Sequence, residues 1–335
     1  MAERKTYLDV IRLLACVLVV LMHSPMDGTP GAIQNAVYVV TAPCIGLFFM
    51  VSGALLLPAE GGLGFLKKRF SKVLVPTIIW SLFYIAANVL IRHQDISLVP
   101  RQILSIPFSP QGHGVMWFMY TLCGLYLLAP VISPWLKSAS RREIEIILLI
   151  WGITLLYPLL KTWLDINEKV QAPLYYFTGY AGYFLLGYYF KRFGICWSRI
   201  KTVLVILVCL SCLAAIRFLP LGIPFDGAIS YLSIFAVLLT AAYFSALERL
   251  GRKIDAESRL AKILEGLSNL SFGVYLVHIF FIRYLFYGFM PGGVKQVLVT
   301  VAVTVVLSFL VSWLISLLPF SQYIIGYKRP KRKIL

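Results

Sequence analysis

The chain has 335 residues, of which 60% are hydrophobic and only 13% are charged, and its mean hydropathy is +0.84. Soluble domains carry about 25% charged residues, so this composition excludes a soluble globular protein and indicates a polytopic membrane protein. The net charge of +17 does not indicate nucleic-acid binding. The basic residues cluster between apolar segments, which is the pattern of membrane proteins whose Lys and Arg stay on the cytoplasmic side.

Hydropathy predicts an all-α bundle of ten transmembrane helices in a single domain that covers residues 1–335. Each span needs about 20 predominantly apolar residues. In chain order, the predicted spans are about 7–24, 35–57, 73–92, 114–136, 143–161, 172–190, 201–219, 228–247, 269–288 and 296–318. No internal repeat is evident. The first apolar segment contains Asp9 and Arg12 and lacks a small-residue cleavage site, so we expect no cleavable signal peptide.

The distribution of Lys and Arg predicts the orientation of these spans. Of the 31 basic residues, twenty-three fall in the N-terminus, the C-terminus and the loops on one side of the predicted membrane. Only six fall in the loops on the other side, and Arg12 and Arg283 lie within helices. Because Lys and Arg are enriched in cytoplasmic loops, both termini are expected in the cytoplasm.

No metal site is expected from the sequence. The six cysteines are Cys16, Cys44, Cys123, Cys196, Cys209 and Cys212, and all of them lie in or next to apolar runs. No combination of His and Cys has the spacing of a metal site. We interpret Cys209 and Cys212, which are one helical turn apart, as small core residues.

The stretch RLLACVLVVLMH carries an arginine and a histidine at its two ends. Arg12 and His23 are separated by about three helical turns, so they lie on nearly the same face, roughly 16 Å apart along the axis. Asp9 lies one turn before Arg12, at a spacing that permits an ion pair. An arginine in a span usually faces the bundle interior or a wet cavity. The alternatives to a buried polar track have no functional role. Arg12 would extend its guanidinium to the membrane surface and pair with Asp9, and His23 would lie at the membrane interface.

Histidine is the residue type best suited to general-base chemistry within this membrane domain. Nearly all Asp and Glu residues lie in loops or at helix ends, and the imidazole has the pKa that the role requires. His23 lies near the outer end of the first span, and His93 and His113 fall in a predicted outer loop. His278 lies midway along the ninth span, where a neutral, buried core histidine is the alternative to a substrate contact. Arg283 follows on the same span, where helix packing or a lipid contact is an equally good interpretation.

The second span and the loop predicted after it offer candidate ligands for a phosphorylated substrate. Ser52 lies about as deep from the cytoplasmic surface as Arg12, and its hydroxyl either contacts a ligand or, with Gly53, allows close helix packing. The following loop, KKRFSKVLVP, contains a dense cationic cluster. Arg and Lys bind phosphates well, but ordinary cytoplasmic charge explains such a cluster equally well. The members of this basic cluster are Lys67, Lys68, Arg69 and Lys72.

These segments together resemble the acyltransferase-3 family of membrane-bound acyltransferases, over nearly the whole chain. YLDVIRLLACVLVVLMH (7–23) is similar to the family's pattern of an Arg and a His separated by ten residues. FFMVSG (48–53), KKRFSKVLVP (67–76), MWFMYTLCGLYLLAP (116–130) and SFGVYLVH (271–278) complete the resemblance. Two positions depart from the family pattern. Lys72 stands where a second arginine is common, and the nearest histidine to the Trp-Phe pair is His113, four residues before Trp117 rather than two.

The resemblance implies an O-acyltransferase that uses cytoplasmic acyl-CoA, in the first place acetyl-CoA, as donor substrate, with no permanently bound cofactor. Its size is similar to that of members that O-acetylate cell-surface glycans, so a glycan or lipid-linked sugar acceptor and a bacterial inner-membrane location are expected. His23 is then the general base, and the catalytic site includes Arg12, which either organises the cavity or contacts CoA, and its ion-pair partner Asp9. The phosphates of CoA contact Lys67, Lys68, Arg69 and Lys72, with Ser52 deeper in the bundle. Acceptor contacts are expected from His113, Trp117, Tyr120, Tyr275 and His278, although aromatic residues at this depth also form interfacial belts.

Other classes of function remain open on the sequence alone. A ten-span protein with a buried Arg–His track could be a transporter or flippase for an anionic lipid-linked sugar. Transporters tend to show repeats and broken helices near the midplane, and the absence of a repeat favours the enzyme. A non-catalytic sensor of CoA or lipid, an acyl-phospholipid donor and an acyl-histidine intermediate are further alternatives that the sequence does not separate.

Overall fold

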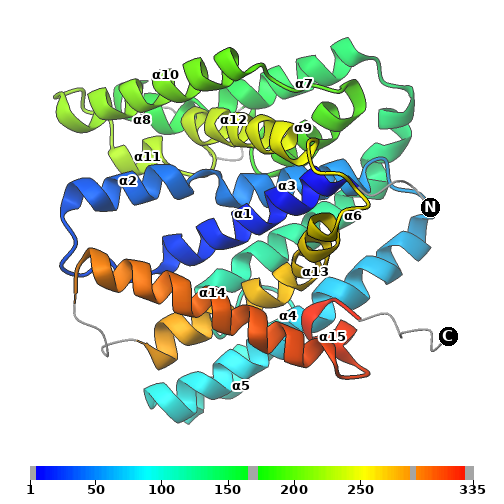
Figure 1. Ribbon diagram of the computed structural model, residues 1–335, viewed down its shortest axis with the longest axis vertical. Coiled ribbons are helices and arrows are strands. Elements are labelled where there is room, and N and C mark those ends of the chain that lie inside the picture. The colour runs from blue at the N-terminus through cyan, green and yellow to red at the C-terminus, as the bar shows by residue number, and fades with distance from the viewer. Residues whose placement is uncertain (1–4, 165–172, 287–291, 329–335) are drawn as a thin grey trace. The chain divides into compact units, whose positions relative to one another are not determined.

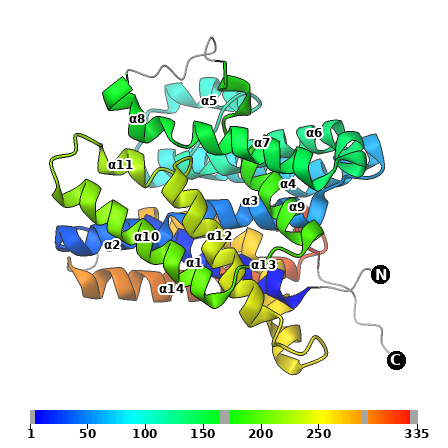
Figure 2. The same cartoon turned by 90° about the horizontal axis from the view of Figure 1, so that it is seen from above.

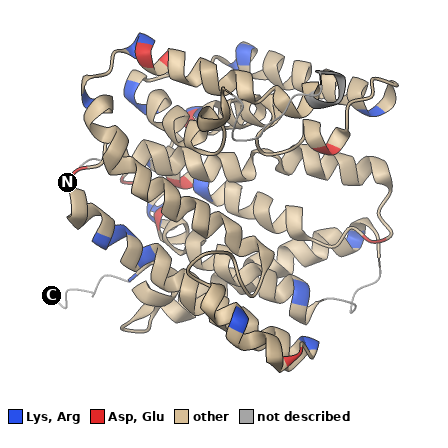
Figure 3. Ribbon diagram, turned by 180° about the vertical axis from the view of Figure 1, so that it is seen from behind, with Lys and Arg blue, Asp and Glu red and all other residues tan. Residues whose placement is uncertain are grey.

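The computed structural model describes residues 5–164, 173–286 and 292–328, and all its regular elements in these ranges are helices (Figure 1). Within the described ranges, nine helical segments are long and apolar enough to cross a membrane. Lys, Arg, Asp and Glu are sparse along the helices and gather mostly near helix ends (Figure 3). Helices satisfy every backbone polar group internally, as a lipid environment requires. The predicted all-α polytopic bundle is therefore confirmed.

The described residues form two compact units that interleave along the chain. Unit 1 comprises the described parts of 1–22, 30–58 and 133–268, and unit 2 comprises those of 23–29, 59–132 and 269–335. Helices α1, α6 and α13 contribute residues to both units.

Unit 1 is built around two helices that lie against each other, α3 and α9. Helix α12 packs on α3, and α10 runs alongside α12 (Figure 2). A second apolar cluster between α10, α11 and α12 contains Cys209, Leu213 and Leu239, which confirms Cys209 as a core residue. The same interpretation was wrong for Cys212, which is exposed on α10. The helices of this unit are α1 (Thr6–His23, through Met22), α2 (Gly31–Thr41), α3 (Pro43–Leu56), the end of α6 (from Ser133), α7 (Arg141–Thr154), α8 (Tyr157–Leu164), η3 (Tyr175–Phe177), α9 (Ala181–Phe193), α10 (Arg199–Phe218), α11 (Phe225–Ala228), α12 (Ile234–Gly251) and the start of α13 (through Ser268).

Two glycines allow α3 and α9 to approach at backbone distance. A Cβ atom on Gly53 would lie 1.8 Å from the carbonyl oxygen of Phe184, and one on Gly187 would lie 1.9 Å from that of Met50. Each glycine therefore contacts the backbone of the other helix, where no side chain fits. Small residues at helix interfaces are the usual device for close packing in membranes, so the packing role considered for Gly53 is confirmed.

Replacement of Gly187 by alanine is expected to destabilise the protein, whereas the same replacement at Gly152 is not. Alanine at 187 must push α9 away from Met50, and overpacking of this kind costs about 1–3 kcal/mol or more. Gly152, inside α7, has no atom within 4 Å of its Cβ position, so alanine there gains up to about 1 kcal/mol of helix propensity. Thermal unfolding of the two purified variants in the same detergent measures both changes in stability. Equal melting temperatures for the two variants would contradict the backbone contact.

Unit 2 contains the longest helix, α4, and the described C-terminal residues. Its elements are α4 (Gly62–Arg92), η1 (Ile96–Leu98), α5 (Val99–Ser105), η2 (Gly114–Met116), α6 (Trp117–Ser138, through Ile132), the end of α13 (Arg259–Phe280, from Asn269), η4 (Phe281–Leu285), α14 (Val294–Ser316) and α15 (Ser321–Ile325). Helix α15 lies against α4, where the Trp80 indole N–H donates to the carbonyl oxygen of Ile324 at 2.9 Å. The backbone at Gly326 approaches the carbonyl oxygen of Lys72, so the chain after α15 is held beside the first turns of α4.

Three local predictions need correction. The KKRFSKVLVP segment is predicted as a loop, but it belongs to α4, which begins at Gly62. Hydropathy missed the start of this helix because the cations lower the mean hydropathy of the segment. The span predicted at 35–57 matches one membrane-crossing segment, Gly31–Leu56, and the correction is that Pro43, which begins α3 directly after α2, divides it into two helices. In the span predicted at 172–190, residue 172 lies outside the described residues. The helix found there, α9, has 13 residues and is about 20 Å long, shorter than the hydrocarbon core.

Candidate functional site

Two histidines from opposite ends of the chain meet in unit 2. His23 ends α1, and His278 lies two residues before the α-helical part of α13 ends. Their ring centroids are 5.4 Å apart, and the ring planes are inclined by 36°. His23 is partly exposed, whereas His278 has no exposed surface. The pair thus has one imidazole that a substrate can reach and one that is enclosed behind it.

The hydrogen bonds of His278 define which nitrogen carries its proton. Nδ1 lies 2.6 Å from the carbonyl oxygen of Tyr275. A carbonyl oxygen can only accept, so Nδ1–H is the donor, and Nε2 of the neutral ring keeps its lone pair. Nε2 is buried and has no hydrogen-bond partner among the described residues. A buried acceptor without a partner costs about 1–3 kcal/mol, which is the kind of cost that functional sites retain.

His113 lies near this pair, and a glycine determines its position. Burial, followed by the charges of Arg283 and Arg92, lowers the pKa of His113 to about 4, so the ring is neutral at pH 7. Its Nδ1 accepts the backbone N–H of Val115 at 3.2 Å, and this leaves Nε2–H as a donor. The preceding Gly112 has φ +79° and would place a Cβ 2.7 Å from the carbonyl oxygen of Ser81. Only glycine fits there, and it holds His113 against α4.

The aromatic residues predicted to contact the acceptor take part mainly in packing. The Tyr275 hydroxyl donates to the carbonyl oxygen of Val115, and its ring lies 5.6 Å from that of His278. The Tyr120 hydroxyl donates to the carbonyl oxygen of Ile106. Trp117 is partly exposed in the first turn of α6. Tyr275 therefore connects the His113 turn to α13, and acceptor contacts by these three residues remain a prediction.

The basic cluster lies near the N-terminal end of α4, whereas the residues of α4 that contact His113 lie nearer its C-terminal end. Lys67, Lys68 and Lys72 are exposed in the first turns of α4, and Arg69 is partly buried. The Arg69 guanidinium lies 5.6 Å from the centre of the Phe65 ring, and its Nε–H is buried without an acceptor among the described residues. Tyr84, whose ring is 5.9 Å from that of His113, follows Arg69 by fifteen residues, or about 22 Å along the helix.

The other predicted site residues belong to unit 1. Asp9 is buried, and Arg12 donates from Nη1 to the hydroxyl of Ser268 at 3.3 Å. Ser52 is partly exposed on α3. Arg12 therefore has a hydrogen-bond partner on α13, which the sequence did not suggest. The contribution of these three residues to a reaction at His23 remains a prediction.

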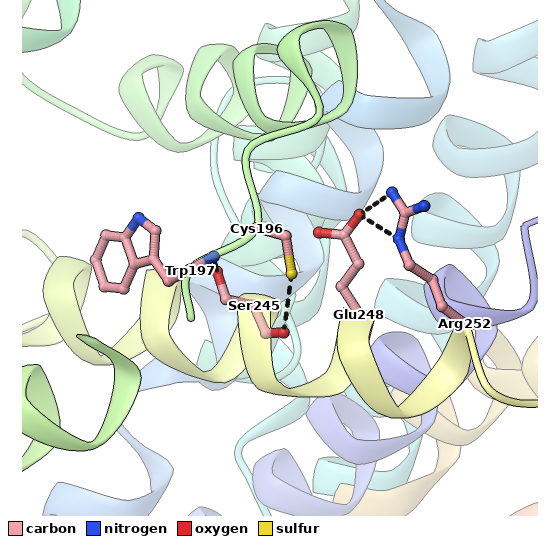
Figure 4. A network of polar contacts seen from close by, with 5 residues as sticks. All are labelled: Cys196, Trp197, Ser245, Glu248 and Arg252. Carbon is pink, nitrogen blue, oxygen red and sulfur yellow. Dashed lines mark hydrogen bonds and ion pairs between the residues drawn. The ribbon is translucent and has the colours of Figure 1, made fainter. Parts of the chain in front are cut away.

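Unit 1 also contains a polar network that the sequence analysis missed (Figure 4). Glu248 is 2% exposed and accepts two bonds at Oε1 from Arg252, at 2.6 and 3.1 Å. One turn earlier, Ser245 accepts from the Trp197 N–H with its hydroxyl and from the Cys196 thiol with its carbonyl oxygen. The network fastens the connection between α9 and α10 to the end of α12. The spacing of Glu248 and Arg252 was the available signal, since these two side chains are four residues apart on one helix.

Comparison with known proteins agrees with this arrangement. A family model described as an acyltransferase domain, that of acyltransferase-3, matches residues 5–317, which include both histidines and the basic cluster. No curated protein and no solved structure matches the chain. The family match spans nearly all of the described helices. The chain therefore belongs to the acyltransferase-3 family and is a membrane acyltransferase.

Proposed function

We propose that the protein transfers an acetyl group from cytoplasmic acetyl-CoA to a hydroxyl of a cell-surface or lipid-linked glycan. The observation that carries the proposal is the pairing of a partly exposed His23 with a buried His278 whose Nε2 has no hydrogen-bond partner among the described residues. A base supported by a second group that is itself oriented by a hydrogen bond is a recurring arrangement in acyl transfer.

In the proposed reaction, His23 removes the proton from the acceptor hydroxyl as its oxygen attacks the thioester carbonyl. The new C–O bond forms, the C–S bond breaks, and the CoA thiolate leaves and takes the proton from the His23 imidazolium. The His278 ring lies 5.4 Å from that of His23, and its Nε2 lone pair stabilises the positive charge that His23 carries in the transition state. General-base catalysis of this kind contributes about 10²–10⁴-fold, and positioning of the two substrates supplies the rest.

The donor would bind along α4, with its phosphates at the basic cluster and its thioester toward the histidines. Arg69 supports this placement, because its buried Nε–H has no acceptor among the described residues, and a phosphate oxygen would satisfy it. The cluster and Tyr84 are about 22 Å apart along the helix, a separation that the long, slender pantetheine arm suits. The predicted orientation puts the cluster at the cytoplasmic side, where acetyl-CoA is made, and His23 at the outer side of a bacterial inner membrane.

Arg69→Ala is expected to raise the KM for acetyl-CoA by roughly 10–100-fold, because a charge-assisted hydrogen bond contributes about 1.5–3 kcal/mol. The KM for the acceptor should stay unchanged. Initial rates at varied donor and acceptor concentrations measure both constants, and Lys262→Ala, which removes an exposed cation on α13, is the matched control. An unchanged donor KM in Arg69→Ala would remove Arg69 from the donor site.

The proposed activity is tested with membranes that contain the wild-type protein. Radiolabelled acetyl-CoA is added with glycolipid and glycan extracted from the host, and the acceptor of the label is identified. Label on a glycan supports the proposal and identifies the acceptor class. If no label moves and the purified protein does not bind acetyl-CoA, the acetyl-CoA assignment is wrong, and transport of a lipid-linked sugar becomes the function to test.

A further inference from the structure

Two arginines lie together at the end of unit 2 that contains the histidine pair. Arg92 is the last residue of α4, and Arg283 is the central residue of η4. The Arg92 Nη2 donates to the carbonyl oxygen of Arg283 at 2.8 Å, and its guanidinium lies 5.1 Å from the centre of the Tyr284 ring. The Tyr284 hydroxyl donates to Asn88, whose amide donates to the carbonyl oxygen of Gly112, the residue before His113. The two arginines and His113 therefore belong to one connected cluster.

A change of helix type directs Arg283 toward this cluster. After Phe280 the α-helix gives way to a π-helix, in which the N–H of Phe286 donates to the carbonyl oxygen of Phe281 at 2.9 Å. In a continued α-helix, Arg283 would lie about 140° around the axis from His278. The wider π turn reduces this angle, and the charge of Arg283 acts on both His113 and His23. Single π turns are rare and are frequent at functional sites.

The Arg283 guanidinium has no anionic partner within the part of the chain that the structure describes. Its guanidinium makes no hydrogen bond and no ion pair with the described residues. Of the acidic residues that the structure describes in this unit, Asp95 is engaged by the N–H and hydroxyl of Ser97, and Asp27 is exposed. Glu60 precedes α4 and is separated from Arg92 by the length of that helix. A partly buried guanidinium in a membrane protein normally has an anionic or backbone partner, so an external anion is the missing partner.

The surroundings of the cluster favour an anion attached to a lipid. Leu90 and Ile91, directly before Arg92, are 76% and 47% exposed, and Leu285, two residues after Arg283, is 45% exposed. Cations therefore stand beside apolar side chains that face outward. A ligand with an anionic head and a hydrocarbon tail satisfies both features, whereas a soluble acidic glycan satisfies only the first.

We propose that Arg283, Arg92 and His113 bind the phosphate of a lipid-linked sugar, so that the acceptor is a sugar carried on a polyprenyl diphosphate rather than a neutral glycan. Guanidinium groups match phosphate oxygens with two parallel hydrogen bonds, and Nε2–H of neutral His113 supplies a further donor. The inference rests on the proposed function, because it names the acceptor class of the same site. The phosphate anchors the carrier lipid, and the sugar hydroxyl is presented to His23.

Binding of matched lipids to the purified protein tests this inference without turnover. Native mass spectrometry compares polyprenyl diphosphate, the uncharged polyprenol of equal length and phosphatidylglycerol. Wild-type protein should bind the diphosphate at least ten-fold more tightly than the other two lipids. Arg283→Gln should lose this preference, Arg283→Lys should retain part of it, and Arg101→Gln, which removes an exposed arginine of α5, should retain all of it.

Equal binding of diphosphate and polyprenol, or an unchanged preference in Arg283→Gln, would overturn the inference. Phosphatidylglycerol binding as tightly as the diphosphate would also overturn it, because the cluster would then hold an ordinary bilayer headgroup. If Arg283→Gln does not fold, Arg92→Gln and Arg283→Lys supply the comparison. Acetyl-CoA binding and acetyl transfer, measured on the same samples, test the proposed function separately. If the protein transfers acetyl groups but does not prefer the diphosphate, only the proposed anion site is wrong. If it prefers the diphosphate but neither binds acetyl-CoA nor transfers acetyl groups, only the proposed acetyltransferase activity is wrong.

Discussion

His23→Ala is expected to lower kcat by about 10²–10⁴-fold, while the protein stays folded and its affinity for acetyl-CoA stays unchanged. His23 is the partly exposed member of the histidine pair, so its removal takes away the group that receives the acceptor proton and leaves the basic cluster on α4 intact. Acetyl transfer to the identified acceptor measures kcat, and equilibrium binding of acetyl-CoA measures the donor affinity.

The control for this variant is His93→Asn. His93 is exposed after α4 and has φ +54°, a conformation that asparagine tolerates, so the replacement should leave kcat unchanged. Normal turnover in His23→Ala would exclude the proposed mechanism. Acetyl label that is bound to the wild-type protein without acceptor and without acid treatment, but not to His23→Ala, would replace general-base catalysis with a labile acetyl-His23 intermediate.

His278→Asn is expected to lower kcat by roughly 10²-fold with little change in either KM. The His278 ring lies 5.4 Å from that of His23 and its Nε2 is buried, so its loss is expected to affect the imidazolium that forms in the transition state more than the bound ground state. His278 acts through His23 and is a positioning residue. The variant His23→Ala/His278→Asn should therefore be no slower than His23→Ala alone.

A purely structural role for His278 gives a different result. Loss of packing at a fully buried position would lower the melting temperature and reduce kcat in the double variant below that of His23→Ala. Steady-state kinetics of the two single variants and the double variant, together with thermal unfolding, separate these cases. An unchanged kcat in His278→Asn would show that Nε2 takes no part in the reaction.

The basic cluster shows which features of the site the local sequence predicts and which it does not. Its charge identified Lys67, Lys68, Arg69 and Lys72 as candidates, because cations next to an apolar span are visible in the sequence. Their helical conformation was missed, since hydropathy windows mark where a helix enters lipid rather than where it begins. That Arg69 is the member whose buried N–H has no acceptor among the described residues depends on how its side chain packs by Phe65.

The composition by itself determined the all-helical membrane architecture, because a chain this apolar must satisfy its backbone hydrogen bonds within each span. It also singled out Arg12 and His23, since ionisable residues are costly in lipid and stand out there. Only the tertiary structure decided that His278 is the partner of His23 and that Arg92 contacts the π turn at Arg283. These relations join segments far apart in the chain, and packing between distant elements leaves no periodic pattern in a single sequence.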